Sequence, residues 1–130
     1  MLYPLSVLRQ TYSMYTLNAD DLDLATAVPK ESACPFFLTV EGEEVSILAK
    51  TKTISKFNKE EPGWRALKIA VDVPLSESGI LKQYVQPLSE KKITVLVMST
   101  YRTDYIFVKD AQLRKALSCL RENGIIVTKG

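Results

Sequence analysis

The sequence contains no histidine. Histidine is the side chain that most often acts as a general base near neutral pH, and it is also the commonest zinc ligand. Its absence excludes Ser-His-Asp and Cys-His catalytic arrangements. The glycine-rich phosphate-binding signatures GxGxxG and GxxxxGK followed by Ser or Thr are absent as well. From these absences we predict that the chain is not an enzyme, has no catalytic residues, and uses no metal and no cofactor.

Long apolar runs, cysteines and excess charge are also scarce. No apolar run approaches the roughly 20 residues of a membrane-spanning helix, and the N-terminal MLYPLSVLRQ lacks the basic start and cleavage site of a secretory signal. Cys34 and Cys119 lie far apart without CxxC spacing, which favours thiols in a reducing compartment. The net charge of +2 is too small to indicate an anionic partner. We therefore expect a cytoplasmic protein that binds neither membrane nor nucleic acid.

The chain has enough apolar content to fold. Of its 130 residues, 46% are hydrophobic and 25% are charged, which is ordinary for a globular protein. This length predicts one compact domain, or two small modules that share a core.

The second half of the chain shows a regular alternation of strand and helix patterns. Period-two and apolar runs predict strands, and apolar residues at helical spacing predict helices. In chain order the pattern predicts a strand at 64–73, a helix at 78–92 capped by Ser76 or Ser78, a strand at 93–98 buried on both faces, a strand at 105–108, a helix capped by Asp110 and ended by Asn123-Gly124, and a strand at 125–128. This βαββαβ order predicts an α+β, ferredoxin-like module.

The first half follows the same plan less completely. Residues 10–17 alternate as a strand, and residues 36–50 form a hairpin that turns at Gly42. The intervening stretch is acidic and is interrupted by Pro29 and Pro35, so at most a short helix fits there. We therefore predict two modules in tandem, a degenerate one at 1–60 and a complete one at 61–130, with the polar stretch 51–63 between them.

The segment LVMSTYRTDYIFV at residues 96–108 contains an unusual hairpin turn. Between its two apolar runs, residues 99–105 include no Gly, Pro or Asn, the residues that tight turns usually need. In the ferredoxin-like sheet this turn meets the loop that leaves the first strand. That topology brings Glu77, at a helix start, close to Thr100, Tyr101 and Asp104.

Two interpretations of this edge remain open. The carboxylates, the hydroxyls and the free amides of a helix start suit a zwitterionic ligand, and Gly79 lets another group approach the backbone. In the alternative, purely structural interpretation, Glu77 favours the helix dipole and Asp104 pairs with Arg102 on the surface.

The stretch from WRALKI to ENGIIV, residues 64–127, resembles an ACT domain of the kind found in the arginine-sensing CASTOR proteins and in small bacterial tandem-ACT proteins. The marks are Trp64, Ser78-Gly79-Ile80-Leu81, Pro87-Leu88, Ser99-Thr100-Tyr101 and Thr103-Asp104-Tyr105. The first half resembles the family's degenerate first module through FFLTV and EEVSILAK.

The resemblance implies a non-catalytic regulatory module that binds an amino acid at a module or subunit interface. Since the arginine sensors look like two copies of this unit in one chain, it also implies a homodimer. Arg102 departs from the family, where Asp or Asn is usual, and a guanidinium there could occupy Glu77 or Asp104. The candidate ligand-binding residues are Glu77, Ser78, Gly79, Ile80, Thr100, Tyr101 and Asp104.

Two other functions are compatible with the sequence. RRM-type RNA-binding modules share the βαββαβ order, and Tyr105 and Phe107 fall on one sheet face, as base stacking requires. However, the glycine of the RRM motif is absent, and the predicted first strand carries no aromatic residue in LKIAV. The other alternative is a dimerisation scaffold that has lost its ligand, which Arg102 favours.

Overall fold

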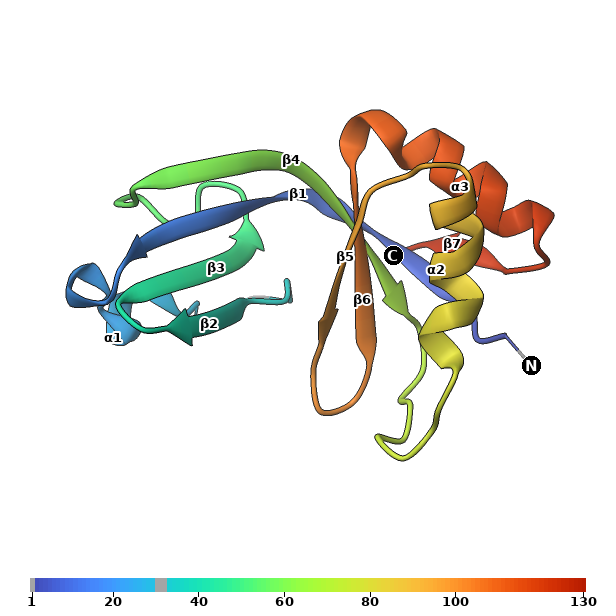
Figure 1. Cartoon of the computed structure of the whole chain (residues 1–130), viewed down its shortest axis with the longest axis horizontal. Coiled ribbons are helices and arrows are strands. Elements are labelled where there is room, and N and C mark those ends of the chain that lie inside the picture. The colour runs from blue at the N-terminus through green and yellow to red at the C-terminus, as the bar shows by residue number, and fades with distance from the viewer. Residues whose placement is uncertain (1, 30–32) are drawn as a thin grey trace. The chain divides into compact units, whose positions relative to one another are not determined.

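The computed structural model describes residues 2–29 and 33–130. They divide into two compact units (Figure 1). Unit 1 combines Met1–Arg9 with Trp64–Gly130, and unit 2 is Gln10–Gly63. The predicted boundary between residues 60 and 61 does not coincide with this division, because the first residues of the chain belong with its second half.

Unit 1 contains the predicted βαββαβ order. Its elements are β4 (Lys59–Ile69, which begins in unit 2), α2 (Ile80–Glu90), β5 (Val95–Ser99), β6 (Asp104–Lys109), the 3-10 turn η2 (Asp110–Gln112), α3 (Leu113–Glu122) and β7 (Val127–Lys129). β6 pairs antiparallel with both β4 and β5. In Figure 1, α2 and α3 lie on the same side of this sheet. The prediction of an α+β, ferredoxin-like fold is confirmed.

The N-terminal residues add a fifth strand to unit 1. β1 (Leu5–Asn18) lies between β4 and β7, so that the strand order in this unit is β7-β1-β4-β6-β5. The pairing with β7 is parallel and joins Leu5 to Val127. On the other side, the N–H of Ala70 donates to the carbonyl of Pro4 at 2.9 Å. The first strand therefore begins earlier than the predicted residue 10.

The core of unit 1 lies between the sheet and the two helices. Alternate residues of β4 and β6 face the helices, as the period of two in a strand requires. The buried residues of this core are Leu5, Val7, Leu67, Ile69, Val73, Ile80, Tyr84, Leu88, Ile93, Ile106, Val108, Ala116, Cys119, Leu120 and Ile125. Burying one such large apolar side chain contributes about 1.5–3 kcal/mol, so this cluster holds the unit together.

The prediction that residues 93–98 form a strand buried on both faces is wrong. β5 lies at the edge of the sheet and pairs only with β6 among the described strands. Val97 is 36% exposed, and the adjacent residues are half-buried. The run is continuously apolar, but an apolar run alone does not distinguish a central strand from an edge strand.

Neither helix of unit 1 begins at a predicted cap. The residue before α2 is Gly79, whose φ of 77° is left-handed, and the structure shows no side-chain cap from the described residues there. Asp110 begins η2 instead of capping α3. Its carboxylate accepts a hydrogen bond from Arg65 at 3.1 Å, and Arg65 also donates to the carbonyl of Leu8 at 3.1 Å.

Unit 2 contains the predicted hairpin and one short helix. It consists of the later part of β1, η1 (Ala19–Asp21), α1 (Leu24–Ala27), β2 (Phe37–Glu41), β3 (Glu44–Lys50) and the start of β4, with strand order β2-β3-β1-β4. Its core residues are Tyr15, Leu17, Val45, Ile47, Ala49 and Ile54. The hairpin turns at Gly42, with φ 61°. That this unit is a degenerate copy of the second module stays a prediction.

Across the residues that the structure describes, no helix is both long enough and apolar enough to cross a membrane.

Candidate functional site

The turn between β5 and β6 is closed by a threonine side chain. The N–H of Thr100 donates to the carbonyl of Thr103 at 2.9 Å. The hydroxyl of Thr100 accepts the N–H groups of Arg102 and Thr103, each at 3.2 Å, and donates to the carbonyl of Thr103 at 3.2 Å. Ser and Thr hydroxyls can stabilise a turn in this way, by bonding the backbone groups of nearby residues. This explains how the turn forms without glycine, proline or asparagine.

Two further hydrogen bonds attach this turn to the chain leaving β4. The hydroxyl of Thr103, which is 6% exposed, donates to the carbonyl of Ile69 at 3.0 Å. The N–H of Val73 donates to the carbonyl of Arg102 at 2.7 Å. The turn and the loop before α2 are therefore adjacent, as the ferredoxin-like topology requires.

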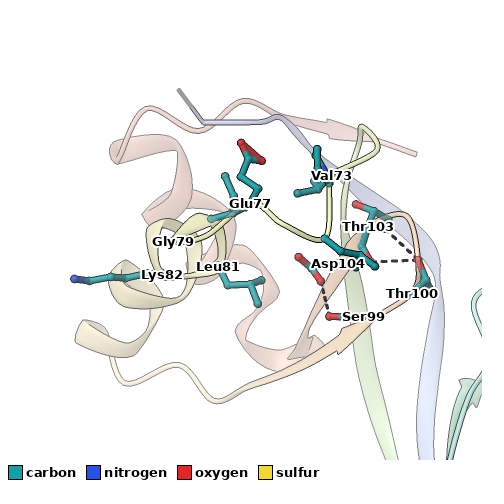
Figure 2. Close-up of a pocket in the computed structure, with 12 residues that line it drawn as sticks. Val73, Glu77, Gly79, Leu81, Lys82, Ser99, Thr100, Thr103 and Asp104 are labelled. Atoms are coloured by element: carbon teal, nitrogen blue, oxygen red, sulfur yellow. Dashed lines mark hydrogen bonds between the residues drawn. The ribbon is translucent and has the colours of Figure 1, made fainter.

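A cavity of about 320 Å³ lies between this loop, the start of α2 and the β5–β6 turn (Figure 2). Its lining is mixed: the apolar side chains come from the loop and the helix, and polar side chains come from the loop, the helix and the turn. The lining residues are Val73, Pro74, Leu75, Glu77, Gly79, Ile80, Leu81, Lys82, Ser99, Thr100, Thr103 and Asp104.

The structure brings together five of the seven candidate residues, namely Glu77, Gly79, Ile80, Thr100 and Asp104. Ser78 does not line the cavity. Tyr101 is 83% exposed and lines a neighbouring cavity instead.

Sequence reasoning missed most of the apolar lining, the cation Lys82 and two hydroxyls. The apolar residues Val73, Pro74 and Leu75 follow the end of β4. The apolar sequence VPL between a predicted strand and a predicted helix could have identified them as lining residues. Ser99 and Thr103 belong to the unusual turn, so the abundance of hydroxyls there could have identified them.

Arg102 does not occupy this cavity. It lines the neighbouring cavity with Asp72, Ser76 and Tyr101, and it is exposed. Among the lining residues, Lys82 is the cation. The Arg102 guanidinium thus lies outside the lining that contains Glu77 and Asp104, which weakens the argument for a blocked site.

The two carboxylates of the cavity have different surroundings. The carboxylate of half-buried Asp104 accepts a hydrogen bond from the Ser99 hydroxyl, and in Figure 2 it points from β6 toward Leu81 on α2. The carboxylate of Glu77 accepts the hydroxyl of Tyr3, with both oxygens at 3.1 Å. This hydrogen bond is the main reason why the pKa of Tyr3 is raised above its ordinary value.

Gly79 contributes conformation and open space. Its φ of 77° is one that residues with a Cβ rarely adopt, and a Cβ placed there would meet nothing within 4 Å. The glycine is therefore required by the backbone turn into α2, not by a close contact. The first N–H groups of the 11-residue α2 have no partner within the helix and carry its positive end.

These features define what the cavity can bind. One side offers the Asp104 carboxylate and hydroxyls, the other offers the start of α2, and Val73, Leu75 and Ile80 supply apolar surface. A carboxylate opposite free amides is complementary to an α-amino acid, whose ammonium and carboxylate are close together. In the described part of the chain, no cluster of three or more His, Cys, Asp or Glu is placed to hold a metal ion.

Residues 59–122 match the family model of the ACT domain. This part of the chain is an ACT domain. The match spans β4, both helices of unit 1 and the β5–β6 turn, and so includes the whole lining of the cavity.

Curated relatives support the resemblance to the arginine sensors. The "cytosolic arginine sensor for mTORC1 subunit 1" of Homo sapiens is 26% identical over 107 residues, covering 73% of this chain and 32% of that protein. The Rattus norvegicus protein of the same name is 29% identical over 108 residues, covering 72% and 31%. The chain thus spans about a third of the length of these relatives.

Solved structures show the same fold. A crystal structure of an Agrobacterium tumefaciens protein has a TM-score of 0.85 and 25% identity, covering 100% of this chain and 95% of that one. The ligand-free regulatory subunit of aspartate kinase from Thermus thermophilus has a TM-score of 0.65 at 10% identity, covering 94% and 97%. The second likeness concerns the fold alone.

The two aromatic residues that an RNA-binding module would use are buried. Tyr105 and Phe107, whose rings are 6.3 Å apart, are 8% and 0% exposed. Base stacking needs exposed aromatic rings, so the structure argues against the RRM-type alternative.

Proposed function

We propose that this chain is a non-catalytic regulatory module that binds an amino acid in the cavity between the start of α2 and the β5–β6 turn. A regulatory, amino-acid-binding role is supported by the ACT match and by the likeness to arginine sensors and aspartate kinase regulatory subunits. The proposed position of the amino-acid site rests on one observation: the Asp104 carboxylate faces the start of α2 across the cavity.

In this proposal each part of the ligand has a complementary group. Its α-ammonium binds the carboxylate of Asp104, because a charge-assisted hydrogen bond in a half-buried place is strong. Its carboxylate binds the amides at the start of α2, next to Gly79. Its side chain packs on the apolar surface of Val73, Leu75 and Ile80.

The relatives support a proposal for the assembly and the compartment. The chain covers about a third of the arginine sensors, and among the solved structures of this fold are regulatory subunits of aspartate kinase. We infer a homodimer, and cytoplasmic placement in agreement with the cytosolic name of those relatives. Light scattering that shows only a 14.6 kDa species at high micromolar concentration would contradict the dimer.

Ligand-dependent stabilisation tests the proposal directly. Thermal unfolding of the full chain is measured with each common amino acid, and a ligand at about 100 times its dissociation constant stabilises the fold by about 2.7 kcal/mol. Asp104→Asn should weaken binding of that ligand by about 1.5–3 kcal/mol, the range for a hydrogen bond to a charged group. Glu122→Gln, which removes an exposed carboxylate of α3 outside the cavity lining, is the matched control.

The ligand-less scaffold is the outcome to be distinguished. If no amino acid at millimolar concentration changes the unfolding temperature of the wild type, the amino-acid site is refuted. Binding that survives Asp104→Asn unchanged would keep an amino-acid-binding module but would refute this cavity as its site.

A further inference from the structure

The N-terminal residue Tyr3 contacts the rim of the cavity although it is far from it in sequence. Its hydroxyl donates to Glu77, with both carboxylate oxygens at 3.1 Å. The Tyr3 side chain is half-buried and packs against the core of unit 1. Tyr3 is not a lining residue of the cavity, and its hydroxyl is joined to the lining through Glu77.

A second tyrosine fixes the backbone of Tyr3. The hydroxyl of Tyr84 on α2 donates to the carbonyl of Tyr3 at 2.7 Å, and Tyr84 is 0% exposed. A buried hydrogen bond of this length is costly to break because the carbonyl would lose its partner. The chain around Tyr3 is thereby attached to the same helix whose start forms one wall of the cavity.

Because the Glu77 carboxylate is bonded to the Tyr3 hydroxyl, the two carboxylates of the cavity point in different directions. In Figure 2 the Asp104 carboxylate points toward Leu81, whereas the Glu77 carboxylate points away from Asp104. To approach a ligand bound at Asp104, Glu77 would have to leave the Tyr3 hydroxyl. A basic ligand needs a second anionic partner for its side chain, and a ligand with a neutral side chain does not.

We propose that Tyr3 is a specificity-determining residue of this cavity: by holding Glu77 at the rim, it leaves Asp104 as the carboxylate that meets the ligand and favours neutral over basic amino acids. This inference rests on the proposed function. It concerns the choice of ligand, and Tyr3 acts as a positioning residue that has no contact with the ligand itself.

The decisive measurement is a ratio of dissociation constants for matched ligands. Lysine is compared with norleucine and arginine with citrulline, since each pair differs mainly in the side-chain charge. Titration calorimetry on the full-length wild type should show tighter binding of the neutral member of each pair. In Tyr3→Phe, which keeps the ring and its packing, the ratio should shift toward the basic member by about three- to tenfold, as expected for one lost hydrogen bond.

Two further variants show whether Tyr3 acts through Glu77. In Glu77→Gln the basic member gains no anionic partner, so adding Tyr3→Phe to this variant should leave the ratio unchanged. Glu122→Gln is the control, because Glu122 is exposed and lies on α3 outside the cavity lining. Independently of any ligand, the Tyr3 phenol in Glu77→Gln should titrate at a lower pH than in the wild type, since Glu77 raises the pKa of Tyr3.

The outcomes separate this inference from the proposed function. If amino acids bind but Tyr3→Phe leaves both ratios at the wild-type value, or if the wild type already prefers lysine and arginine, the role of Tyr3 is refuted and the amino-acid site stands. If no amino acid binds to any variant, the proposed function fails and the inference falls with it.

Discussion

The buried hydroxyl of Thr103 allows a test of how the β5–β6 turn is held. Replacing Thr103 with Val keeps the shape of the side chain but removes the donor to the Ile69 carbonyl. The group is 6% exposed, so water does not readily replace the lost hydrogen bond. A buried acceptor left without its donor costs about 1–3 kcal/mol, and we expect Thr103→Val to lower the free energy of unfolding by that amount.

Thr100→Val is the comparison variant. Its hydroxyl takes part in three hydrogen bonds of 3.2 Å, but Thr100 is exposed, and the N–H of Thr100 keeps its bond to the Thr103 carbonyl. Water can hydrate the freed amides, so a loss of about 1 kcal/mol or less is expected. Urea unfolding measures both values. A larger loss in Thr100→Val than in Thr103→Val would refute the reasoning that burial decides the cost.

Three other predictions concern stability and dynamics. Gly79→Ala should lower the free energy of unfolding by about 1 kcal/mol in urea unfolding, because alanine is strained at a left-handed φ; an unchanged value would contradict this. Burial raises the pKa of Tyr84 above its ordinary value of 10.0. The neutral phenol therefore stabilises the folded state below pH 10.0. This contribution to stability is lost as the pH rises through the folded-state pKa. The urea midpoint should therefore fall more between pH 9 and pH 11, about one unit either side of the ordinary value, in the wild type than in Tyr84→Phe. Amides of β6 should exchange with solvent more slowly than those of the edge strand β5, as measured by hydrogen exchange; equal rates would contradict the edge position.

The parts of the fold that the sequence predicted are local. The hairpin at 36–50 follows from period-two alternation on either side of Gly42, and the alternating strand and helix patterns after residue 64 predict the βαββαβ order. Each of these patterns is contained within a few neighbouring residues. Tertiary packing changed their ends by a few residues but not their type.

The parts that the sequence did not predict depend on pairings between distant residues. Leu5 pairs with Val127, at the other end of the chain. Its neighbours give no sign of which strand it will join, because apolar residues at positions 2, 5 and 7 would fit any sheet edge. The position of β5 was missed for the same reason: burial on one face or two depends on the neighbouring strand, not on the strand's own composition.

For the candidate site, the sequence predicted which loops lie close together but not where their side chains point. Topology brought Glu77, Thr100 and Asp104 to one place. It could not show that Glu77 turns to Tyr3, because that contact again joins the N-terminus to the middle of the chain. Nor could it show that Tyr101 projects outward, since this depends on the hydrogen bonds of the Thr100 hydroxyl.

The polar side chains of the hydroxyl-rich turn have two different roles. The hydroxyls of Thr100 and Thr103 are used by the fold, in closing the turn and in attaching it to the end of β4. Ser99 and Asp104 bond to each other at the cavity wall, and the Asp104 carboxylate has further acceptor sites for a ligand. A structural role and a ligand-binding role can therefore coexist in this turn, because the threonine hydroxyls serve the fold and the Asp104 carboxylate keeps acceptor sites for a ligand. Changes at the threonines should lower stability with little effect on ligand preference. Asp104→Asn should do the reverse, and a large loss of stability in that variant would show that its carboxylate serves the fold as well.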